Sequence, residues 1–254
     1  RPPRSTLFPY TTLFRSQGVG KVFGPLRALD GVDVSVRANT FHGLIGPNGS
    51  GKSTLLKAIA GDHFATEGTI NFDGDDITML RPFERARLGL SLKFQITAVL
   101  PELSPYDNLL LASQAERSVW SLIRSGSKGE LHDEIMDSLE RFSLADNADE
   151  LAANLSHGQQ QWLEISMSLI RKPKMLLLDE PTGGMSPEER RATGELLLPI
   201  KAHCALVIVE HDLDFIKDIC DHLTVLDQGQ VLDDGTVSEI EASTKVQEVY
   251  TTRV

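Results

Sequence analysis

The sequence predicts an α/β fold, in which a mostly parallel sheet is flanked by helices. Short apolar runs at Thr40–Ile45, Met175–Leu178 and Ala205–Val209 have the length of buried parallel strands. Shorter alternating segments with turns fill Val19–Val36 and predict an N-terminal antiparallel β part. From about Ile96 to Ile170 the apolar residues recur at helical spacing, which predicts an inserted α-helical part.

The remaining elements follow from turn and capping signals. We expect turns at Gly24-Pro25 and Asp30-Gly31, a hairpin turn at Asp73-Gly74 and a last hairpin at Asp227–Gly229. The expected helices are Ser53–Ala60 (ended by Gly61), Asn108–Ala115, Leu131–Phe142, Gln160–Ile170 and one opened by Ser186-Pro187, where Glu189 completes a capping box.

The composition predicts an ordinary globular protein. Of 254 residues, 41% are hydrophobic and 24% are charged, so one large domain with a packed core is expected. The formal net charge of −11 argues against a nucleic-acid partner, because a phosphate backbone is normally met by a basic surface. No apolar run approaches the roughly 18 residues that span a bilayer, so membrane association is expected to be peripheral. Cys204 and Cys220 lack metal or redox spacing and fit buried thiols of a reducing cytoplasm.

The first sixteen residues do not resemble the rest of the chain. Arg1–Ser16 contains three prolines and two Thr-Leu-Phe repeats, without helical or strand periodicity. A disordered or targeting tail is one interpretation. However, Thr6–Ser16 matches the in-frame translation of a common short-read sequencing adapter. We therefore interpret residues 1–16 as a non-native tail that replaces part of the first strand, and we expect the fold to begin at Gln17.

A glycine-rich loop connects the first buried strand to the following helix, and it fits the pattern G-x-x-x-x-G-K-[ST]. The loop consists of Gly46, Pro47, Asn48, Gly49, Ser50, Gly51, Lys52 and Ser53, and Thr54 follows in the helix. Glycines let backbone N–H groups surround a phosphate, and the positive end of the helix favours an anion. Lys52 is suited to the β- and γ-phosphates, and the Ser53 hydroxyl to Mg²⁺. A plain glycine-rich turn is the alternative, but the flanking strand and helix favour the nucleotide-binding core of a P-loop NTPase.

Acidic residues follow a second buried strand. Asp179 and Glu180 come directly after Met175–Leu178, and Glu210-His211 follow the next core strand. Such residues can simply be solvated strand ends. Beside a phosphate loop, Asp179 is suited to hold Mg²⁺ through water and Glu180 to act as the general base on the attacking water. A strand parallel to the phosphate-loop strand would bring His211 to the same edge of the sheet.

The stretch Leu155-Ser156-His157-Gly158-Gln159 resembles the signature motif of ABC transporter ATPases, which commonly reads L-S-G-G-Q. The phosphate loop, Gln95, Asp179-Glu180 and His211 also occur in the order of that family, so the resemblance covers nearly all of Gln17–Val254. It implies a head-to-tail dimer with a second ATPase subunit, identical or closely related, that encloses two ATP molecules. Ser156, His157, Gly158 and Gln159 would face the ATP of the other subunit, which is reasonable because free N–H groups at a helix start attract anions.

The resemblance also implies further roles at single positions. Gln95 matches the glutamine that senses Mg²⁺ and the γ-phosphate, so the implied metal ligands are Ser53, Gln95 and Asp179. His211 matches the histidine that contacts the γ-phosphate, and it joins Glu180, Lys52 and Gln95 in the catalytic group. Phe23 matches the aromatic residue that stacks on adenine, although a phenylalanine in that hairpin could equally belong to the core.

The sequence departs from the family pattern at two positions. His157 stands where glycine is commonest, and Ser186 stands where many members have aspartate. Neither change removes an atom that the chemistry requires, but Ser186 leaves the coupling across the dimer open.

Several stretches are similar to one branch of the family, the importers of branched-chain amino acids, urea and short amides, and are closest to the urea-type branch. These stretches are Leu155–Ile165, Phe72-Asp73-Gly74, Lys93-Phe94-Gln95 and Val246–Tyr250. The resemblance implies membrane permease partners, an indirect periplasmic solute-binding protein and a place at the cytoplasmic face of the inner membrane. Residues such as Ala98–Asn108 are candidates for the permease contact.

The expected domain organisation divides residues 17–254 into a nucleotide-binding core (17–94 and 171–254) and a helical insertion with the signature motif (95–170). Other functions remain as alternatives. One is a soluble ABC ATPase that acts on DNA or ribosomes, which the chain length and negative charge disfavour. Others are a GTPase or small kinase, for which no Asn-Lys-x-Asp motif occurs, and a silent ATP-binding regulator, which the presence of Glu180 and His211 disfavours.

Overall fold

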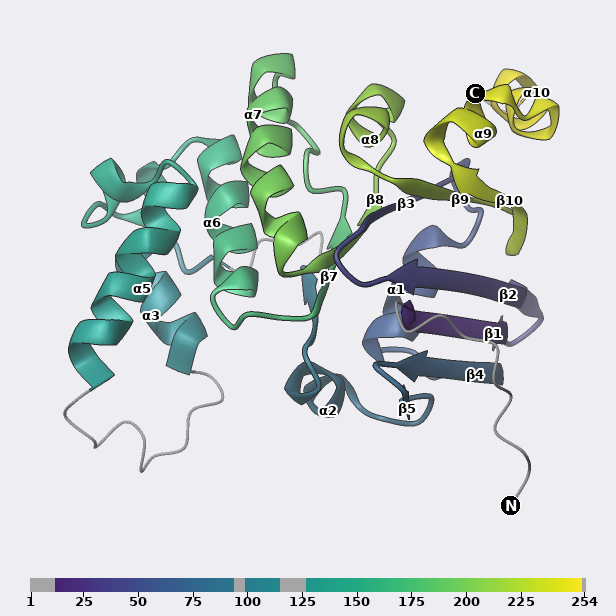
Figure 1. Cartoon of the computed structure of the whole chain (residues 1–254), viewed down its shortest axis with the longest axis horizontal. Coiled ribbons are helices and arrows are strands. Elements are labelled where there is room, and N and C mark those ends of the chain that lie inside the picture. Colours follow the sequence, from purple (N-terminus) through teal and green to yellow (C-terminus); the bar gives the residue numbers. More distant parts are fainter. Residues whose placement is uncertain (1–11, 94–98, 115–126, 253–254) are drawn as a thin grey trace.

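The computed structural model describes residues 12–93, 99–114 and 127–252, and two sheets form its centre (Figure 1). A four-stranded sheet has the order β2-β1-β4-β5, with bounds Leu26–Arg37, Thr12–Phe23, Glu67–Phe72 and Asp75–Asp76. A six-stranded sheet has the order β10-β9-β3-β8-β7-β6, with bounds Gln230–Thr236, His222–Asp227, Phe41–Ile45, Ala205–Val209, Met175–Asp179 and Leu90–Lys93.

The six-stranded sheet is parallel except for its last strand. The pairs β3–β8, β3–β9, β7–β8 and β6–β7 are parallel, and β10 runs antiparallel to β9. Every residue of β3, β7 and β8 is buried, which explains why these strands appear in the sequence as continuous apolar runs. The predicted α/β class is confirmed. Because the central strands are parallel, their carboxyl ends meet at one edge of the sheet.

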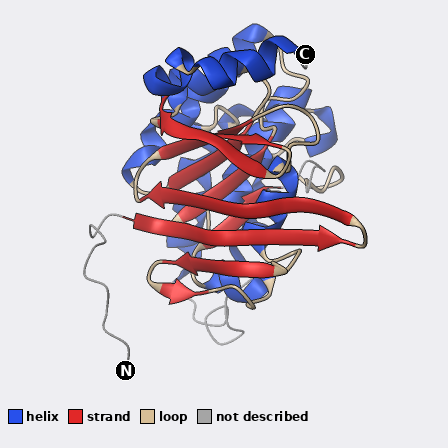
Figure 2. Cartoon of the chain, turned by 90° about the vertical axis from the view of Figure 1, so that its right-hand side faces the viewer, coloured by secondary structure: helices blue, strands red, loops and turns tan. Residues whose placement is uncertain are grey.

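The helices gather mainly around the six-stranded sheet. Figure 1 shows α3, α5 and α6 together at the end of the molecule opposite the antiparallel sheet, and Figure 2 shows the strands of that sheet along one side with helices behind them. The bounds are α1 Lys52–Ala60, α2 Pro82–Arg87, α3 Pro105–Gln114, α5 Ser127–Arg141, α6 His157–Leu169, α7 Pro187–Leu197, α8 Leu213–Ile219, α9 Val237–Ala242 and α10 Thr244–Thr252, with short 3-10 helices at Ala145–Asn147, Ala152–Asn154 and Leu198–Ala202. No helix within the described ranges is long and apolar enough to cross a bilayer.

Two apolar clusters lie on the two faces of the parallel sheet. Leu176 and Leu178 of β7 point into the cluster shared with α3 and α5–α9, whereas Met175 and Leu177 point into the cluster shared with α1 and the antiparallel sheet. Burial of each such side chain stabilises the fold by roughly 1.5–3 kcal/mol. Cys204 and Cys220 are buried free thiols, as expected, and burial raises the pKa of Cys204 to about 12.

The antiparallel sheet differs from the sequence prediction in one turn. Gly24 has a φ of 56° at the expected turn between β1 and β2. Asp30-Gly31, however, lies inside β2, where the register shifts between the pairs Val19–Val32 and Lys21–Leu29. The predicted turn at Asp30-Gly31 is therefore wrong. The positive φ of 64° at Gly31 is used for a β-bulge instead of a chain reversal.

The residues Thr12–Ser16, which the sequence analysis sets outside the fold, form the first part of β1. Phe14 pairs with Val36 of β2 and Phe72 of β4, and its side chain is 1% exposed. The Ser16 hydroxyl donates to the Val32 carbonyl and accepts from the Val34 N–H. The expectation that the fold begins at Gln17 is therefore wrong for residues 12–16, because β2 and β4 pair with this segment on both sides. Its adapter origin stays a prediction.

Arg85 of α2 binds the last turn of α1, a role that its sequence context does not predict. Its fully buried guanidinium donates to the carbonyls of Ala58 and Ile59 at 2.7 Å each, and also to those of Thr78 and Leu80. The last carbonyls of a helix have no partner within the helix, so Arg85 satisfies two of them. Burial lowers the pKa of Arg85 to about 10, which leaves it charged at neutral pH.

Replacing Arg85 is expected to destabilise the protein strongly. Arg85→Met keeps the apolar stem but leaves buried carbonyls unpaired, and we expect a loss of about 3 kcal/mol in the free energy of unfolding. Urea denaturation, monitored by circular dichroism, measures this loss in the free energy of unfolding. Arg87→Met, at an exposed position on the same helix, is the control and should change the value by less than about 0.5 kcal/mol. Equal effects of the two substitutions would show that Arg85 does not anchor α1.

Candidate nucleotide site

A cavity of about 520 Å³ opens at the carboxyl edge of the parallel sheet. It joins the glycine-rich loop, the start of β2, the residues after β7 and β8, and the turn between β9 and β10. The lining residues are Leu26, Arg27, Ala28, Asn48, Gly49, Ser50, Gly51, Lys52, Ser53, Thr54, Glu180, His211, Gln228 and Gly229. Most of the glycine-rich loop therefore faces one space with Glu180 and His211.

The shape of the loop depends on two glycines. Gly46 and Gly51 have φ values of 145° and 107°, which side-chain-bearing residues rarely adopt. A Cβ atom at Gly46 would lie 2.1 Å from the Leu226 carbonyl oxygen, and one at Gly51 would lie 2.9 Å from the Ala28 carbonyl oxygen. Gly51 caps α1 without a side-chain hydrogen bond, so the first N–H groups of α1 remain available to an anion.

Lys52 is held against the loop that precedes it. Its ammonium group donates to the Gly46 carbonyl at 2.7 Å and to the Pro47 carbonyl at 3.1 Å, and the residue is 6% exposed. Burial lowers the pKa of Lys52, while the charges of Glu180 and Asp179 act in the opposite direction. The loop thus presents a cation next to the N-terminus of α1, and both favour a bound phosphate.

Asp179 carries an unpaired carboxylate oxygen. It ends β7, is 7% exposed, and its Oδ1 has no hydrogen-bond partner among the residues that the structure describes. Burial, and then the charge of Glu180, raise the pKa of Asp179, whereas a hydrogen bond with Ser53 lowers it. A buried polar atom without a partner is costly. A carboxylate beside a serine hydroxyl is an oxygen donor set that suits Mg²⁺, so these two residues fit that ion.

Glu180 and His211 form a hydrogen-bonded pair at the mouth of the cavity. His211 Nε2 lies 2.8 Å from Glu180 Oε1, and the two side chains are 47% and 33% exposed. Glu180 has a φ of 50°, and its N–H donates to the Val209 carbonyl of the neighbouring strand. The pair is therefore open to solvent and lies close to the phosphate loop, which is the position that a base acting on water needs.

Glu210, which the sequence suggests only as a strand end, binds the segments that follow Glu180 and carry His211. Its buried carboxylate accepts hydrogen bonds from the Thr182 N–H at 2.8 Å and from the Thr182 hydroxyl at 2.6 Å. Its other oxygen accepts from the His211 N–H at 3.1 Å. Glu210 thereby joins the loop after Glu180 to the segment that carries His211.

The signature residues lie away from this cavity, at the start of α6. Ser156 is the N-cap, and its hydroxyl accepts from the Gln159 N–H while the Gln159 side chain accepts from the Ser156 N–H. The His157 imidazole contacts the Gly183 carbonyl at 3.0 Å. Gly158 packs against Glu189 of α7. None of these four residues lines the cavity described above.

The adenine-stacking residue expected from the sequence, Phe23, lies outside the cavity. Its ring meets His63 edge-on, with the Lys21 ammonium 4.9 Å from the ring centroid. Leu26 and Arg27 of the next strand face the cavity instead. Gln95 lies outside the described residues.

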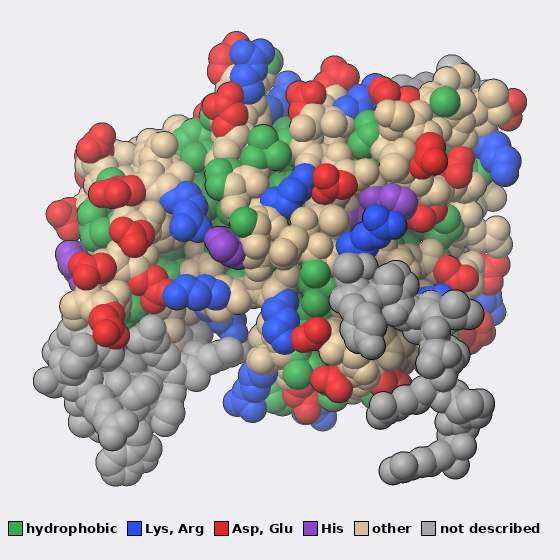
Figure 3. Space-filling view, in the orientation of Figure 1, with side chains coloured by type: hydrophobic (Ala, Val, Ile, Leu, Met, Phe, Trp, Pro, Cys, Tyr) green, Lys and Arg blue, Asp and Glu red, His purple; other side chains and the backbone are tan. Residues whose placement is uncertain are grey.

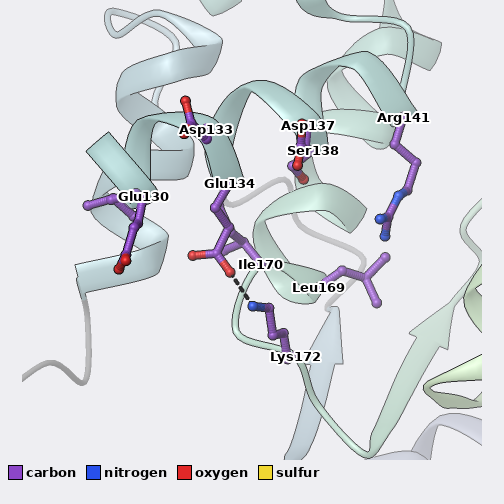
Figure 4. A pocket seen from close by; sticks show the side chains of 10 residues that line it. Glu130, Asp133, Glu134, Asp137, Ser138, Arg141, Leu169, Ile170 and Lys172 are labelled. Atoms are coloured by element: carbon purple, nitrogen blue, oxygen red, sulfur yellow. Dashed lines mark ion pairs between the residues drawn. The ribbon is translucent and has the colours of Figure 1, made fainter. Parts of the chain in front are cut away.

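A second cavity, of about 610 Å³, lies between α5 and the end of α6 (Figure 4). Its charged lining is mostly acidic and consists of Glu130, Asp133, Glu134, Asp137 and Arg141 of α5, with Lys172 on the opposite side. Lys172 pairs with Glu134 at 2.5 Å. A polyphosphate would be repelled by these carboxylates, so this cavity is not a nucleotide site. On the face shown in Figure 3, acidic and basic side chains are interspersed.

Comparisons with known proteins identify the family. Residues 29–183 match the ABC transporter family model. A probable branched-chain amino acid transport ATP-binding protein LivG of Archaeoglobus fulgidus is 35% identical over 94% of this chain and 95% of its own length. The high-affinity LivG of Salmonella typhimurium is 32% identical over 94% and 97%.

The solved structures agree with this result. The ADP conformation of MJ1267, an ATP-binding cassette of an ABC transporter, is similar with a TM-score of 0.85 at 33% identity, over 95% of this chain and 99% of that one. The cavity and its phosphate loop thus lie in a fold like that of this solved ATP-binding cassette. The chain therefore belongs to the ATP-binding proteins of the ABC transporter family, which bind ATP and hydrolyse it to drive transport.

Proposed function

We propose that this protein powers the import of a small solute, and that the cavity at the carboxyl edge of the sheet is where it hydrolyses ATP. The observation that carries the proposal is the meeting of the phosphate loop, Lys52, Asp179, Glu180 and His211 at one edge of the sheet. Each of these groups matches a requirement of phosphoryl transfer: phosphate binding, charge neutralisation, metal binding and activation of water.

In the proposed reaction the residues act mainly by position and charge. The loop N–H groups and Lys52 bind the β- and γ-phosphates and offset the charge that develops during transfer. Glu180 accepts a hydrogen bond from the attacking water and polarises it. His211, held by its hydrogen bond to Glu180, would contact the γ-phosphate.

We assign the Mg²⁺ site to Ser53 and Asp179, together with Gln95. The unpaired Asp179 Oδ1 and its neighbour Ser53 support this assignment. When bound, Mg²⁺ neutralises charge on the β- and γ-phosphates. Burial and the Glu180 charge raise the pKa of Asp179, and a cation at this position would act in the opposite direction and favour the ionised carboxylate.

We further propose that two cassettes, identical or closely related, close around two ATP molecules. Ser156, His157, Gly158 and Gln159 would contact the ATP bound by the other subunit. Two features support this role. Ser156 and His157 are exposed, and the four residues lie outside the cavity of their own chain. Ser156 opens a helix whose first N–H groups suit an anion.

The helical insertion, residues 95–170, is our candidate for transmitting this closure to membrane permeases. Within Ala98–Asn108, Leu100 is 46% exposed, and Leu151 on an adjacent segment is 50% exposed. The two segments are tied together, because Ala153 N–H donates to the Pro101 carbonyl and Ala152 N–H to the Leu103 carbonyl. These two exposed leucines on joined segments are available for a contact with another protein.

The relatives point to a class of solute. They are named for branched-chain amino acid transport, so we propose branched-chain amino acids or chemically related small molecules such as urea and short amides. The urea-type assignment rests on the sequence motifs alone. A periplasmic binding protein would deliver the solute, and the cassette would act at the cytoplasmic face of the inner membrane. The family match favours this function over a soluble ATPase that acts on DNA or ribosomes.

Glu180→Gln is expected to stop hydrolysis while preserving ATP binding. The amide keeps the size of the side chain but cannot act as a base, so kcat should fall about 100-fold or more. With ATP present, the variant should accumulate as a dimer in size-exclusion chromatography. Glu188→Gln, an exposed change in α7, is the matched control and should behave like the wild type. Turnover of Glu180→Gln near the wild-type rate would refute the assignment of the base.

Lys52→Ala is expected to remove tight ATP binding. The change deletes the cation of the phosphate loop but leaves Gly46 and Gly51, so the fold should persist. We expect affinity for a fluorescent ATP analogue to fall at least about tenfold. Lys217→Ala removes a lysine paired with Glu241 on α9 and is the control. Unchanged affinity in Lys52→Ala would contradict the proposed phosphate site.

A further inference from the structure

We propose that His157 is a positioning residue, which holds the loop after Glu180 in place by a hydrogen bond from the start of the signature helix. This role rests on the proposed function, because it matters for catalysis only if Glu180 is the base. The segment concerned, residues 181–186, is called the Glu180 loop below.

The contact is direct. His157 Nε2 lies 3.0 Å from the Gly183 carbonyl oxygen. A carbonyl only accepts hydrogen bonds, so Nε2 must carry the hydrogen in this arrangement. The next residue, Gly184, has a φ of 77°, and a Cβ atom there would lie 3.1 Å from His157 Nε2. The imidazole therefore fills the space beside two consecutive glycines.

A second set of contacts joins the signature helix α6 to α7, the helix that follows the Glu180 loop. A Cβ atom at Gly158 would lie 2.6 Å from Glu189 Oε1, and the other oxygen of Glu189 accepts from the Ser186 N–H at 2.8 Å. Further along, the Trp162 indole donates to the Thr193 hydroxyl at 2.8 Å. The starts of α6 and α7 are thus packed together, which keeps His157 at a fixed distance from the Glu180 loop.

The opposite side of the Glu180 loop is also held. Gly183 N–H donates to the Glu180 carbonyl at 3.2 Å, and Thr182 is bound by Glu210, which also binds His211. Consecutive glycines have more conformational freedom than any other residues, so the loop depends on such outside contacts. With glycine at position 157, the commoner residue in the motif, the Gly183 carbonyl would lose its side-chain partner.

The consequence concerns the two ATP molecules of the proposed dimer. The start of α6 would serve the ATP of the other subunit, whereas Glu180 would serve the ATP of its own chain. Within one polypeptide, His157 connects the start of α6 to the Glu180 loop. Loss of the bond should therefore slow turnover without weakening ATP binding at the phosphate loop.

Amide hydrogen exchange of the full chain without nucleotide tests the contact itself. In His157→Phe, which keeps the ring but not the donor, we expect peptides covering 181–186 to exchange at least about threefold faster than in the wild type. His157→Gln, whose amide can still donate, should stay close to the wild type. His203→Phe, at an exposed histidine outside the site, is the control. Equal exchange in His157→Phe and the wild type would overturn the proposal.

Steady-state ATPase kinetics test the consequence. We expect His157→Phe to lower kcat about fivefold and His157→Gln to lower it less, while the Kd of the monomeric subunit for ATP at its own phosphate loop changes less than about twofold. An equal loss of kcat in both variants, or an unchanged kcat in His157→Phe, would overturn the positioning role. A wild type without ATPase activity would instead contradict the proposed function, and the exchange experiment would then decide on the contact alone.

Discussion

The close approach of the phosphate loop to two neighbouring strands is the constraint on which the site depends. Gly46 lies against the Leu226 carbonyl at the end of β9, and Gly51 lies against the Ala28 carbonyl of β2. Hydrogen bonds extend this contact, because Gly229 N–H donates to the Ser50 carbonyl and Asp30 N–H to the Gly229 carbonyl. The two sheets thus meet at the loop, and their packing fixes the N–H groups of the proposed nucleotide site.

Parallel strands supply the rest of the site. Because β3, β7 and β8 run in the same direction, the phosphate loop, Asp179, Glu180 and His211 arrive at one edge of the sheet, although long crossover connections separate these strands in the sequence. Glu210 then restrains the segments that follow β7 and β8. Arg85 holds the far end of α1, so the helix that begins at the phosphate loop is anchored at both ends.

Much of the fold and most of the candidate site could be predicted from sequence, where the signal is local. Buried strands, the glycine-rich loop, the capping box at Ser186 and the turn at Asp73-Gly74 each depend on a few adjacent residues. Residues whose structural roles depend on partners far away in the sequence were not predicted. Lys93 of the short strand β6 pairs with Glu164 of α6 at 3.1 Å, with both side chains buried, and neither Arg85 nor Glu210 has a local signature. Local signals can also mislead, since Asp30-Gly31 suits a bulge as well as a turn.

At Glu180 the backbone conformation lowers stability, whereas the side chain serves the proposed activity. The φ of 50° lies in the left-handed region, which costs a residue with a Cβ atom roughly 1 kcal/mol relative to glycine. Glycine would relieve this strain but would remove the carboxylate beside His211. On the proposed function that carboxylate is the general base, so a glycine that raised the free energy of unfolding at this position would lower turnover.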